Sequence, residues 1–242
     1  MMRTILCYGD SNTFGYMPLT GARYRMNERW TGLLQAKLGE EYRVIEEGCS
    51  GRTTVRDDPK EPWKNGLSYL KACLHTHKPL DLVILMLGSN DLKICFQASP
   101  REIAEDAGTL IRIIQEFLLE KQGSAPQIIL VSPPALGEEI RKSPFYGGDD
   151  GFDEESLAKS KEFPGYYRRI SDRYGCAFVD AARFVRASAE DQLHLTAEGH
   201  AVLSEVLCDA VLKLEQPPEN AETIMRRTRG QDVPDAACRG GN

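Results

Sequence analysis

The chain has 242 residues, of which 41% are hydrophobic, and this length allows one large domain with a single core. The formal net charge is −6 and the basic residues are scattered, so nucleic acid is not an expected partner. The longest apolar run, Leu82–Leu87, is far shorter than a membrane-spanning helix, and Met1–Arg3 leads directly into a strand-like segment. The sequence therefore predicts a cytoplasmic protein with no membrane contact. Its seven widely spread cysteines form no C-x-x-C pair, which favours reduced thiols over a disulfide framework.

Five short apolar or β-branched segments recur along the chain, with segments of helical period between them. The predicted strands are Thr4–Tyr8, Tyr42–Glu46, Leu82–Leu87, Gln127–Val131 and Cys176–Val179. Near-continuous apolar runs of this length are typical of strands that are buried on both faces of a parallel sheet. The alternation of strands and helices predicts an α/β fold, a three-layer α/β/α sandwich around a five-stranded parallel sheet.

The clearest helix is predicted from Ser99 to Lys121, where apolar residues form one stripe. It begins with Ser99-Pro100-Arg101-Glu102, the pattern of a capping box. Further helices are expected near residues 27–38, 65–75 and 196–214. A helical segment also follows Asp153, where Pro164 either kinks one long helix or separates two.

Two regions break this pattern. Residues 135–165 are rich in glycine and proline and carry aromatic residues that look exposed, namely Phe145, Tyr146 and Phe152. The first half of this region predicts a rim or lid beside a site, with a tolerated surface insertion as the alternative. Residues 217–242 have few large apolar side chains and are predicted to be a poorly ordered tail, so the single domain spans residues 1–216.

Polar residues follow the predicted strands at four places. These are Gly9-Asp10-Ser11, Gly48-Cys49-Ser50-Gly51, Gly88-Ser89-Asn90-Asp91 and Asp191-Gln192-Leu193-His194. We expect them to converge, because the crevice of an open parallel sheet lies at the carboxyl ends of its strands. Acyl transfer through a serine needs a base, a group that orients the base, and donors for the oxyanion. Ser11 is the candidate nucleophile and His194 the candidate base, and Asp191 can reach the imidazole Nδ1 from three residues earlier.

Two further residues are candidate oxyanion donors beside the Ser11 N–H. Gly51 offers a backbone N–H that no side chain obstructs, and Asn90 offers a side-chain N–H. Each candidate alone has an ordinary structural explanation. Ser11 can cap a helix, Asn90 can form a turn, and an acid such as Asp191 commonly precedes a helix. Only the complete set, in this order at strand ends, indicates a site.

The other histidines and the remaining acid of the first stretch have simpler interpretations. His75 and His77 alternate along a predicted helix end and are expected to be solvated rather than metal ligands. His200 is expected to be structural. Asp10 is expected to hold its turn by accepting hydrogen bonds from backbone N–H groups.

The four stretches together resemble the SGNH hydrolases, also called the GDSL family of esterases and lipases, over about residues 3–214. The resemblance implies a flavodoxin-like SGNH hydrolase fold with no metal or organic cofactor. It also implies a triad of Ser11, Asp191 and His194, with Gly51 and Asn90 as oxyanion donors.

Three segments look like the bacterial arylesterase and acyltransferase branch of that family: RWTGLLQAKLG, VIEEGCSGRTTVRDDP and PLDLVILMLGSNDLK. That branch hydrolyses short acyl esters, can pass the acyl group to alcohols, and includes homo-oligomers. Asn12 departs from the leucine of the family name, and Phe14 and Tyr16 stand where the branch looks to carry tryptophan. These departures bear on acyl-chain preference.

The expected function is that of a serine esterase acting on small carboxylic esters, short acyl or aryl, with water or an alcohol as the acyl acceptor. Trp30, Phe14 and the lid aromatics are expected to keep the site dry and so favour acyl transfer. One alternative is a carbohydrate O-deacetylase of the same family. Another is a non-catalytic flavodoxin-like module that binds a phosphate at Gly9–Thr13, although Asp10 opposes an anion there. An ordinary α/β-hydrolase is disfavoured because Gly-x-Ser-x-Gly is absent from the sequence.

Overall fold

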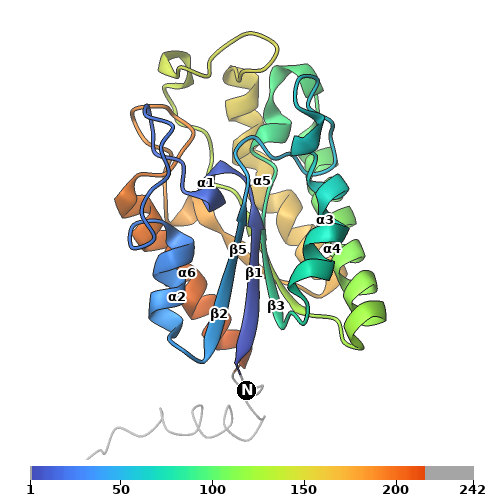
Figure 1. The fold of residues 1–242 in the computed structure, drawn as a ribbon. Coiled ribbons are helices and arrows are strands. Elements are labelled where there is room, and N and C mark those ends of the chain that lie inside the picture. Colours follow the sequence, from blue (N-terminus) through green and yellow to red (C-terminus); the bar gives the residue numbers. More distant parts are fainter. Residues whose placement is uncertain (1, 216–242) are drawn as a thin grey trace, which may run out of the picture.

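A computed structural model describes residues 2–215 of the chain, and Figure 1 shows its arrangement. The five predicted strands are all present and all parallel, in the order β2-β1-β3-β4-β5, which is the flavodoxin-like order. They are β1 (Arg3–Gly9), β2 (Tyr42–Gly48), β3 (Leu82–Met86), β4 (Gln127–Ser132) and β5 (Ala177–Asp180). The predicted tail at 217–242 lies outside the described residues.

Helices cover both faces of the sheet, as Figure 1 shows. One face carries α2 (Trp30–Leu38) and α6 (Ala197–Glu215), and the other carries α3 (Gly66–His77), α4 (Pro100–Gln122) and α5 (Glu154–Tyr174). A single turn, α1 (Ser11–Phe14), follows β1 at its carboxyl end. The predicted three-layer α/β/α sandwich is therefore confirmed.

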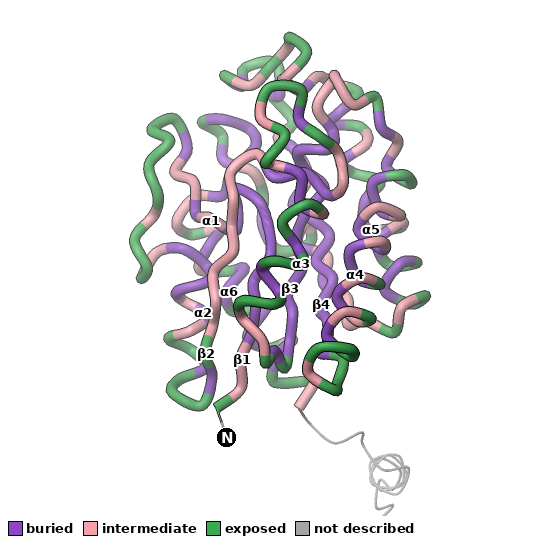
Figure 2. Tube along the Cα trace, turned by 45° about the vertical axis from the view of Figure 1, so that its right-hand side comes forward, coloured by how far each residue is buried: buried purple, intermediate pink, exposed green. Residues whose placement is uncertain are grey.

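The apolar runs of the strands are explained by two cores, one on each side of the sheet. Along β1, Leu6 and Tyr8 pack on the side of α3, α4 and α5, whereas Ile5 and Cys7 pack on the side of α2 and α6. All four side chains are buried. Figure 2 shows the same continuous burial along the central strands, while the helices expose one side. A strand between two cores cannot alternate apolar and polar residues, so its sequence reads as one apolar run.

The helix boundaries follow local capping chemistry. The capping box of Ser99 and Glu102 is present at the start of α4. Asn65 caps α3 by accepting hydrogen bonds from the first N–H groups of that helix. The helix after Asp153 is a single one, α5, which continues through Pro164. Residues 154–165 of the predicted rim thus belong to this helix.

The expectation that Phe152 is exposed was wrong. Only 2% of its surface is exposed, because residues 145–152 close into a small loop that turns this ring inward. Tyr146 of the same loop is exposed, as expected.

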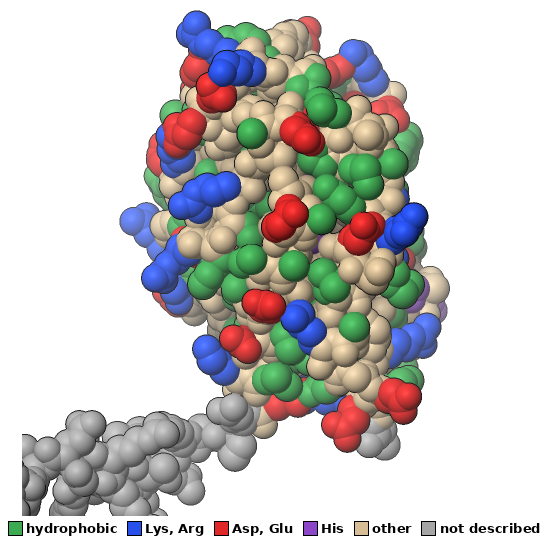
Figure 3. Space-filling model, turned by 90° about the vertical axis from the view of Figure 1, so that its left-hand side faces the viewer, with side chains coloured by type: hydrophobic (Ala, Val, Ile, Leu, Met, Phe, Trp, Pro, Cys, Tyr) green, Lys and Arg blue, Asp and Glu red, His purple; other side chains and the backbone are tan. Residues whose placement is uncertain are grey.

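The charged side chains of the described residues are spread over the surface, as the scattered basic residues of the sequence predicted. Basic and acidic side chains are interspersed among apolar ones on the face seen in Figure 3, so this face carries no basic stripe. No helix within residues 2–215 combines the length and the apolar character that crossing a membrane requires. The six cysteines in the same range are all free.

His200 lies in the core between α6 and α2. Its Nδ1 accepts a hydrogen bond from the backbone N–H of Trp30 at 3.4 Å. The Tyr24 ring meets the imidazole edge-on, with 5.2 Å between the ring centroids. The ring is fully buried, and this burial lowers the pKa of His200 from 6.5 to about 4.

Acid should therefore destabilise the fold through His200. Between pH 6.5 and about 4 the unfolded chain binds a proton that the folded chain does not, so stability falls as the pH falls through this window. The shift corresponds to roughly 3 kcal/mol in total. Urea unfolding across this range should show that His200→Asn loses this part of the pH dependence, whereas His75→Asn, at an exposed position, keeps it. Equal pH dependence in all three proteins would contradict the assignment.

Candidate active site

A continuous hydrogen-bonded chain joins three of the predicted site residues. The Nε2 atom of His194 lies 2.9 Å from the Ser11 Oγ, and its Nδ1 lies 2.7 Å from the Asp191 Oδ2. Ser11 and His194 are 183 positions apart in sequence. All three residues are buried, so water competes little for these bonds.

The tight turn that presents Ser11 depends on the two residues before it. A Cβ on Gly9 would lie 2.0 Å from the Thr13 Oγ1 and 2.8 Å from the Met86 carbonyl oxygen, so only glycine fits there. Asp10 caps α1, since its Oδ1 accepts the Asn12 N–H at 3.0 Å, which is the turn-holding contact expected from the sequence. Burial raises the pKa of Asp10 to about 6.

Asp191 is held by more than the imidazole. Its Oδ1 accepts the backbone N–H groups of Leu193 and His194 at 3.0 and 2.9 Å, and the Ser188 hydroxyl donates to the same oxygen at 2.9 Å. Burial acts to raise the pKa of Asp191, but the bonds from His194 and from these backbone groups outweigh it, and the pKa is lowered. The carboxylate stays ionised and faces Nδ1 with Oδ2 alone.

The two predicted oxyanion donors lie in the same cavity wall as Ser11. Gly51 has a φ of +84°, a left-handed conformation that favours glycine. Asn90 uses one amide hydrogen to bond the Arg52 carbonyl oxygen at 3.1 Å, which leaves the second for a substrate. The structure thus brings all five sequence-predicted site residues together.

A buried acid to which the sequence analysis assigned no role, Asp91, connects the loops carrying these donors. Asp91 accepts the Thr54 hydroxyl at 2.6 Å and the Thr54 N–H at 3.0 and 3.1 Å. Burial raises the pKa of Asp91 to about 7. The position of Asp91 in the Gly-x-Asn-Asp stretch was visible in the sequence, but its partner 37 residues away was not.

Two aromatic rings enclose His194. Tyr16 stacks on the imidazole at 4.1 Å between ring centroids, and Phe145 meets it edge-on at 5.6 Å. The expectation that Trp30 and Phe14 help to keep the site dry was wrong, because neither lines the cavity. Trp30 is buried beneath α1, where its indole N–H donates to the Asn12 carbonyl oxygen, and Phe14 lies under the Arg23 guanidinium.

A cavity of about 200 Å³ opens beside the Ser11–His194 pair. Its lining includes Ser11, Tyr16, Ser50, Gly51, Lys64, Asn90, Lys93, Phe145, Asp150, Phe152, Leu193 and His194. Three of these, Phe145, Asp150 and Phe152, come from the segment predicted as a rim or lid. That segment is fastened to the loop of Asp191, because Ser143 donates to the Asp191 carbonyl oxygen.

Asn12, the departure from the leucine of the GDSL motif, faces the histidine loop rather than the cavity. Its Oδ1 accepts the Leu195 N–H at 3.0 Å, and its Nδ2 donates to the Leu193 carbonyl oxygen at 3.5 Å. These two backbone groups flank His194. The sequence analysis connected Asn12 with acyl-chain preference. The contact with the histidine loop spans more than 180 positions, so the sequence alone could not predict it.

The expectation that both histidines of the His-x-His pair are solvated is half right. His75 is exposed, whereas His77 is half-buried and bonded to Glu47. None of these residues lines the cavity.

A parallel sheet of this order, with a serine, histidine and aspartate in line at its carboxyl edge, defines a hydrolase of the SGNH fold class. The family model of the GDSL-like lipase/acylhydrolase family matches residues 7–202, and the chain belongs to that family.

Similar solved structures carry esterase names. Est24, a carbohydrate acetylesterase from Sinorhizobium meliloti, is 38% identical with a TM-score of 0.81, and the match covers 88% of this chain and 99% of that one. The aryl esterase of M. smegmatis is 36% identical with a TM-score of 0.79, and covers 88% of this chain and 99% of its own. A comparison with curated proteins gave no match.

Proposed function

We propose that the protein is a serine esterase that hydrolyses small carboxylic esters through an acyl-enzyme intermediate on Ser11. The observation that carries this proposal is the hydrogen-bonded chain from Ser11 through His194 to Asp191 at the wall of a small cavity. A phosphate-binding module would not need a base and an orienting acid in line with its serine, and the buried Asp10 would repel the anion.

In the first step the Ser11 Oγ attacks the ester carbonyl carbon while the His194 Nε2 takes the hydroxyl proton. The carbonyl electron pair moves to the oxygen, which the N–H groups of Ser11, Gly51 and Asn90 stabilise. When the tetrahedral intermediate collapses, the bond to the alkoxy oxygen breaks and His194 protonates the departing alcohol. Asp191 holds the imidazole in the tautomer that can accept the proton.

In the second step a water molecule gives its proton to His194 and attacks the acyl carbon. The acid is released as the Ser11 Oγ recovers its proton. An alcohol in place of water would yield a new ester by the same route, and Tyr16 and Phe145 favour this by covering the imidazole.

The size of the cavity supports short acyl groups. Its volume of about 200 Å³ is below the range of roughly 300–1,000 Å³ for drug-sized ligands. Two substrate classes remain in view, aryl or short alkyl esters and acetylated carbohydrates, because both names occur among the similar structures.

The experiment that tests the proposal is labelling with a fluorophosphonate, followed by peptide mass spectrometry. The adduct should lie on Ser11 and should be lost in His194→Ala. Ser50→Ala is the matched control, since Ser50 lines the same cavity and its loss should leave the adduct in place. Labelling at another residue, or none in the native chain, would reject the esterase.

The substrate class is decided by a panel of p-nitrophenyl esters from acetate to octanoate, beside acetylated xylo-oligosaccharides. Rates should fall beyond short acyl chains. Release of acetate from the sugar at a rate near that of the aryl ester would favour the deacetylase. Adding benzyl alcohol and measuring benzyl ester gives the share of acyl transfer.

Asn12→Leu should lower kcat by about 10–100-fold with little change in KM, because the loop of His194 loses both hydrogen bonds that the Asn12 side chain makes to it. The substitution restores the residue of the family motif, and leucine has the same branching and as many side-chain heavy atoms as asparagine. Urea unfolding of the same variant separates a positioning role from lost stability. If kcat stays within twofold of the native value, Asn12 does not position His194.

A further inference from the structure

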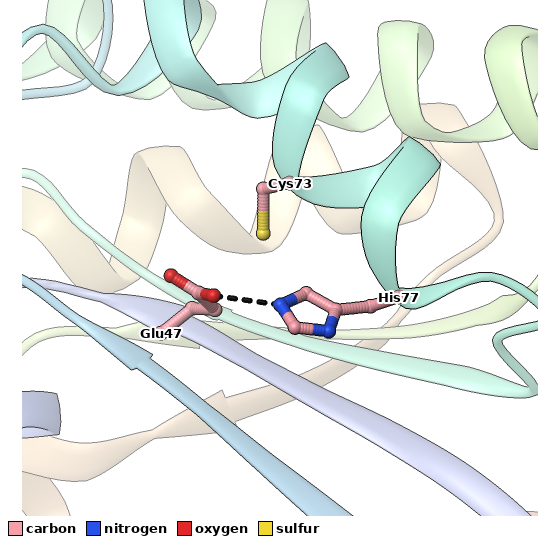
Figure 4. Close-up of side chains that lie close together, drawn as sticks. All are labelled: Glu47, Cys73 and His77. Atoms are coloured by element: carbon pink, nitrogen blue, oxygen red, sulfur yellow. Dashed lines mark hydrogen bonds and ion pairs between the residues drawn. The ribbon is translucent and has the colours of Figure 1, made fainter.

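Three side chains with metal-binding atoms converge on the side of the sheet that carries α3, and none of them takes part in the proposed reaction. Cys73 and His77 are four residues apart on α3 and so lie on one face of it. Glu47 reaches them from β2, and Figure 4 shows the three side chains turned toward a common point. Their ligand atoms all lie within 4.8 Å of one another, and the His77 Nε2 lies 2.7 Å from the Glu47 Oε1.

This spacing is close to that of a tetrahedral zinc site. With zinc bonds of about 2.0–2.3 Å, the ligand atoms of such a site stand roughly 3.3–3.8 Å apart. The Glu47–His77 pair must open, and the thiol must approach, by about 1 Å or less if they are to reach it. Carboxylate, imidazole and thiolate are all zinc ligands, and with a thiolate and a carboxylate the two charges of the ion are neutralised.

The burial of the three side chains also suits a site of this kind. The Cys73 side chain is fully buried, whereas the side chains of Glu47 and His77 are 19% and 21% exposed and form the solvent-facing entrance of the site. Solvent at this entrance can supply a fourth ligand.

Two features oppose binding. Burial raises the pKa of the Cys73 thiol to about 12, so the ion must displace a proton from it. The Arg52 guanidinium is also nearby, but it is directed to the Gly9 and Glu47 carbonyl oxygens and to the Tyr8 ring. These contacts do not involve the Glu47 carboxylate, and the guanidinium charge makes the affinity for the ion lower than that of a four-cysteine site.

We propose that Glu47, Cys73 and His77 form a zinc site that joins the end of β2 to α3. On binding, the ion exchanges hydration waters for the Glu47 carboxylate oxygen, the His77 Nε2 and the Cys73 sulfur, and the thiol proton passes to solvent. Because β2 leads into the loop of Gly51, the bound ion would stabilise that part of the fold without entering the reaction.

The test is titration of the metal-free, full-length chain with Zn²⁺ and, for spectroscopy, with Co²⁺. We expect one strong site, a thiolate-to-cobalt absorption band in the near ultraviolet, and a higher unfolding temperature with Zn²⁺. Cys73→Ser and His77→Gln should remove the band and weaken binding by about 100-fold or more.

His75→Gln and Cys176→Ser are matched controls, a neighbouring exposed histidine and a half-buried thiol in the connection between α5 and β5, and both should bind as the native chain does. If Cys73→Ser does not fold, the partly exposed His77 still provides the test. No binding, or binding that survives His77→Gln, would overturn the proposal. Ester hydrolysis is measured separately and does not bear on the result.

Discussion

Ser11→Ala is expected to lower kcat for p-nitrophenyl acetate by about 10⁶-fold, because the variant has no atom that can form the acyl-enzyme. What remains is the small rate that the oxyanion donors and substrate binding supply without a nucleophile. The loss should lie almost wholly in kcat rather than KM, and can be measured with purified protein in a stopped assay over hours.

The same variant should fold normally, since among the described residues the Ser11 hydroxyl hydrogen-bonds to His194 alone. An unchanged unfolding midpoint in urea would establish this. Ser50→Ala, in the same cavity wall, should stay within about threefold of the native rate. More than a hundredth of native activity in Ser11→Ala would show that another group attacks the ester.

Asp191→Asn is expected to lower kcat by about 10⁴-fold while the geometry of the site is kept. The N–H groups of Leu193 and His194 already occupy one side of the carboxylate, so the amide oxygen of asparagine must take that side. Its NH₂ group then faces the His194 Nδ1 and forces the proton onto Nε2. An imidazole in this tautomer cannot accept the proton of Ser11.

Asp180→Asn is the matched control, because this aspartate ends β5 at the same edge of the sheet and caps a turn that asparagine also caps. Its rate should stay within about twofold of the native one. A neutron structure or ¹⁵N spectra of the His194 ring would report the tautomer directly. A loss below tenfold in Asp191→Asn would mean that the carboxylate does not orient the base.

The sheet could be predicted because its information is local. Every strand was placed to within about two residues. For the central strands the reason is that a short apolar run between turn signals favours a strand buried on both faces of a parallel sheet. Helix starts were less certain where a turn precedes the helix. The helix expected from residue 27 begins at Trp30, because Glu28 and Arg29 first close a separate turn onto the Arg25 carbonyl oxygen.

Some residues of the candidate site could likewise be predicted from local sequence, and others could not. Ser11, Gly51, Asn90, Asp191 and His194 could be proposed because each follows a predicted strand, and the fold brings strand ends together. Phe145 belongs to the lid aromatics that were expected at the site, whereas the stacking of Tyr16 on His194 could not be predicted, because no periodicity encodes that contact. Phe152 was misjudged for a related reason: a glycine-rich loop gives no local sign of which ring it turns inward.

The 183 positions between Ser11 and His194 also matter for synthesis of the protein. A chain growing on the ribosome exposes Ser11 early but cannot pair it until His194 has emerged. A nascent or truncated chain that ends before residue 191 would therefore contain the serine without any means to ionise it. Ester cleavage should begin only when the last strand and its loop have docked, which makes turnover a sensitive reporter of complete folding.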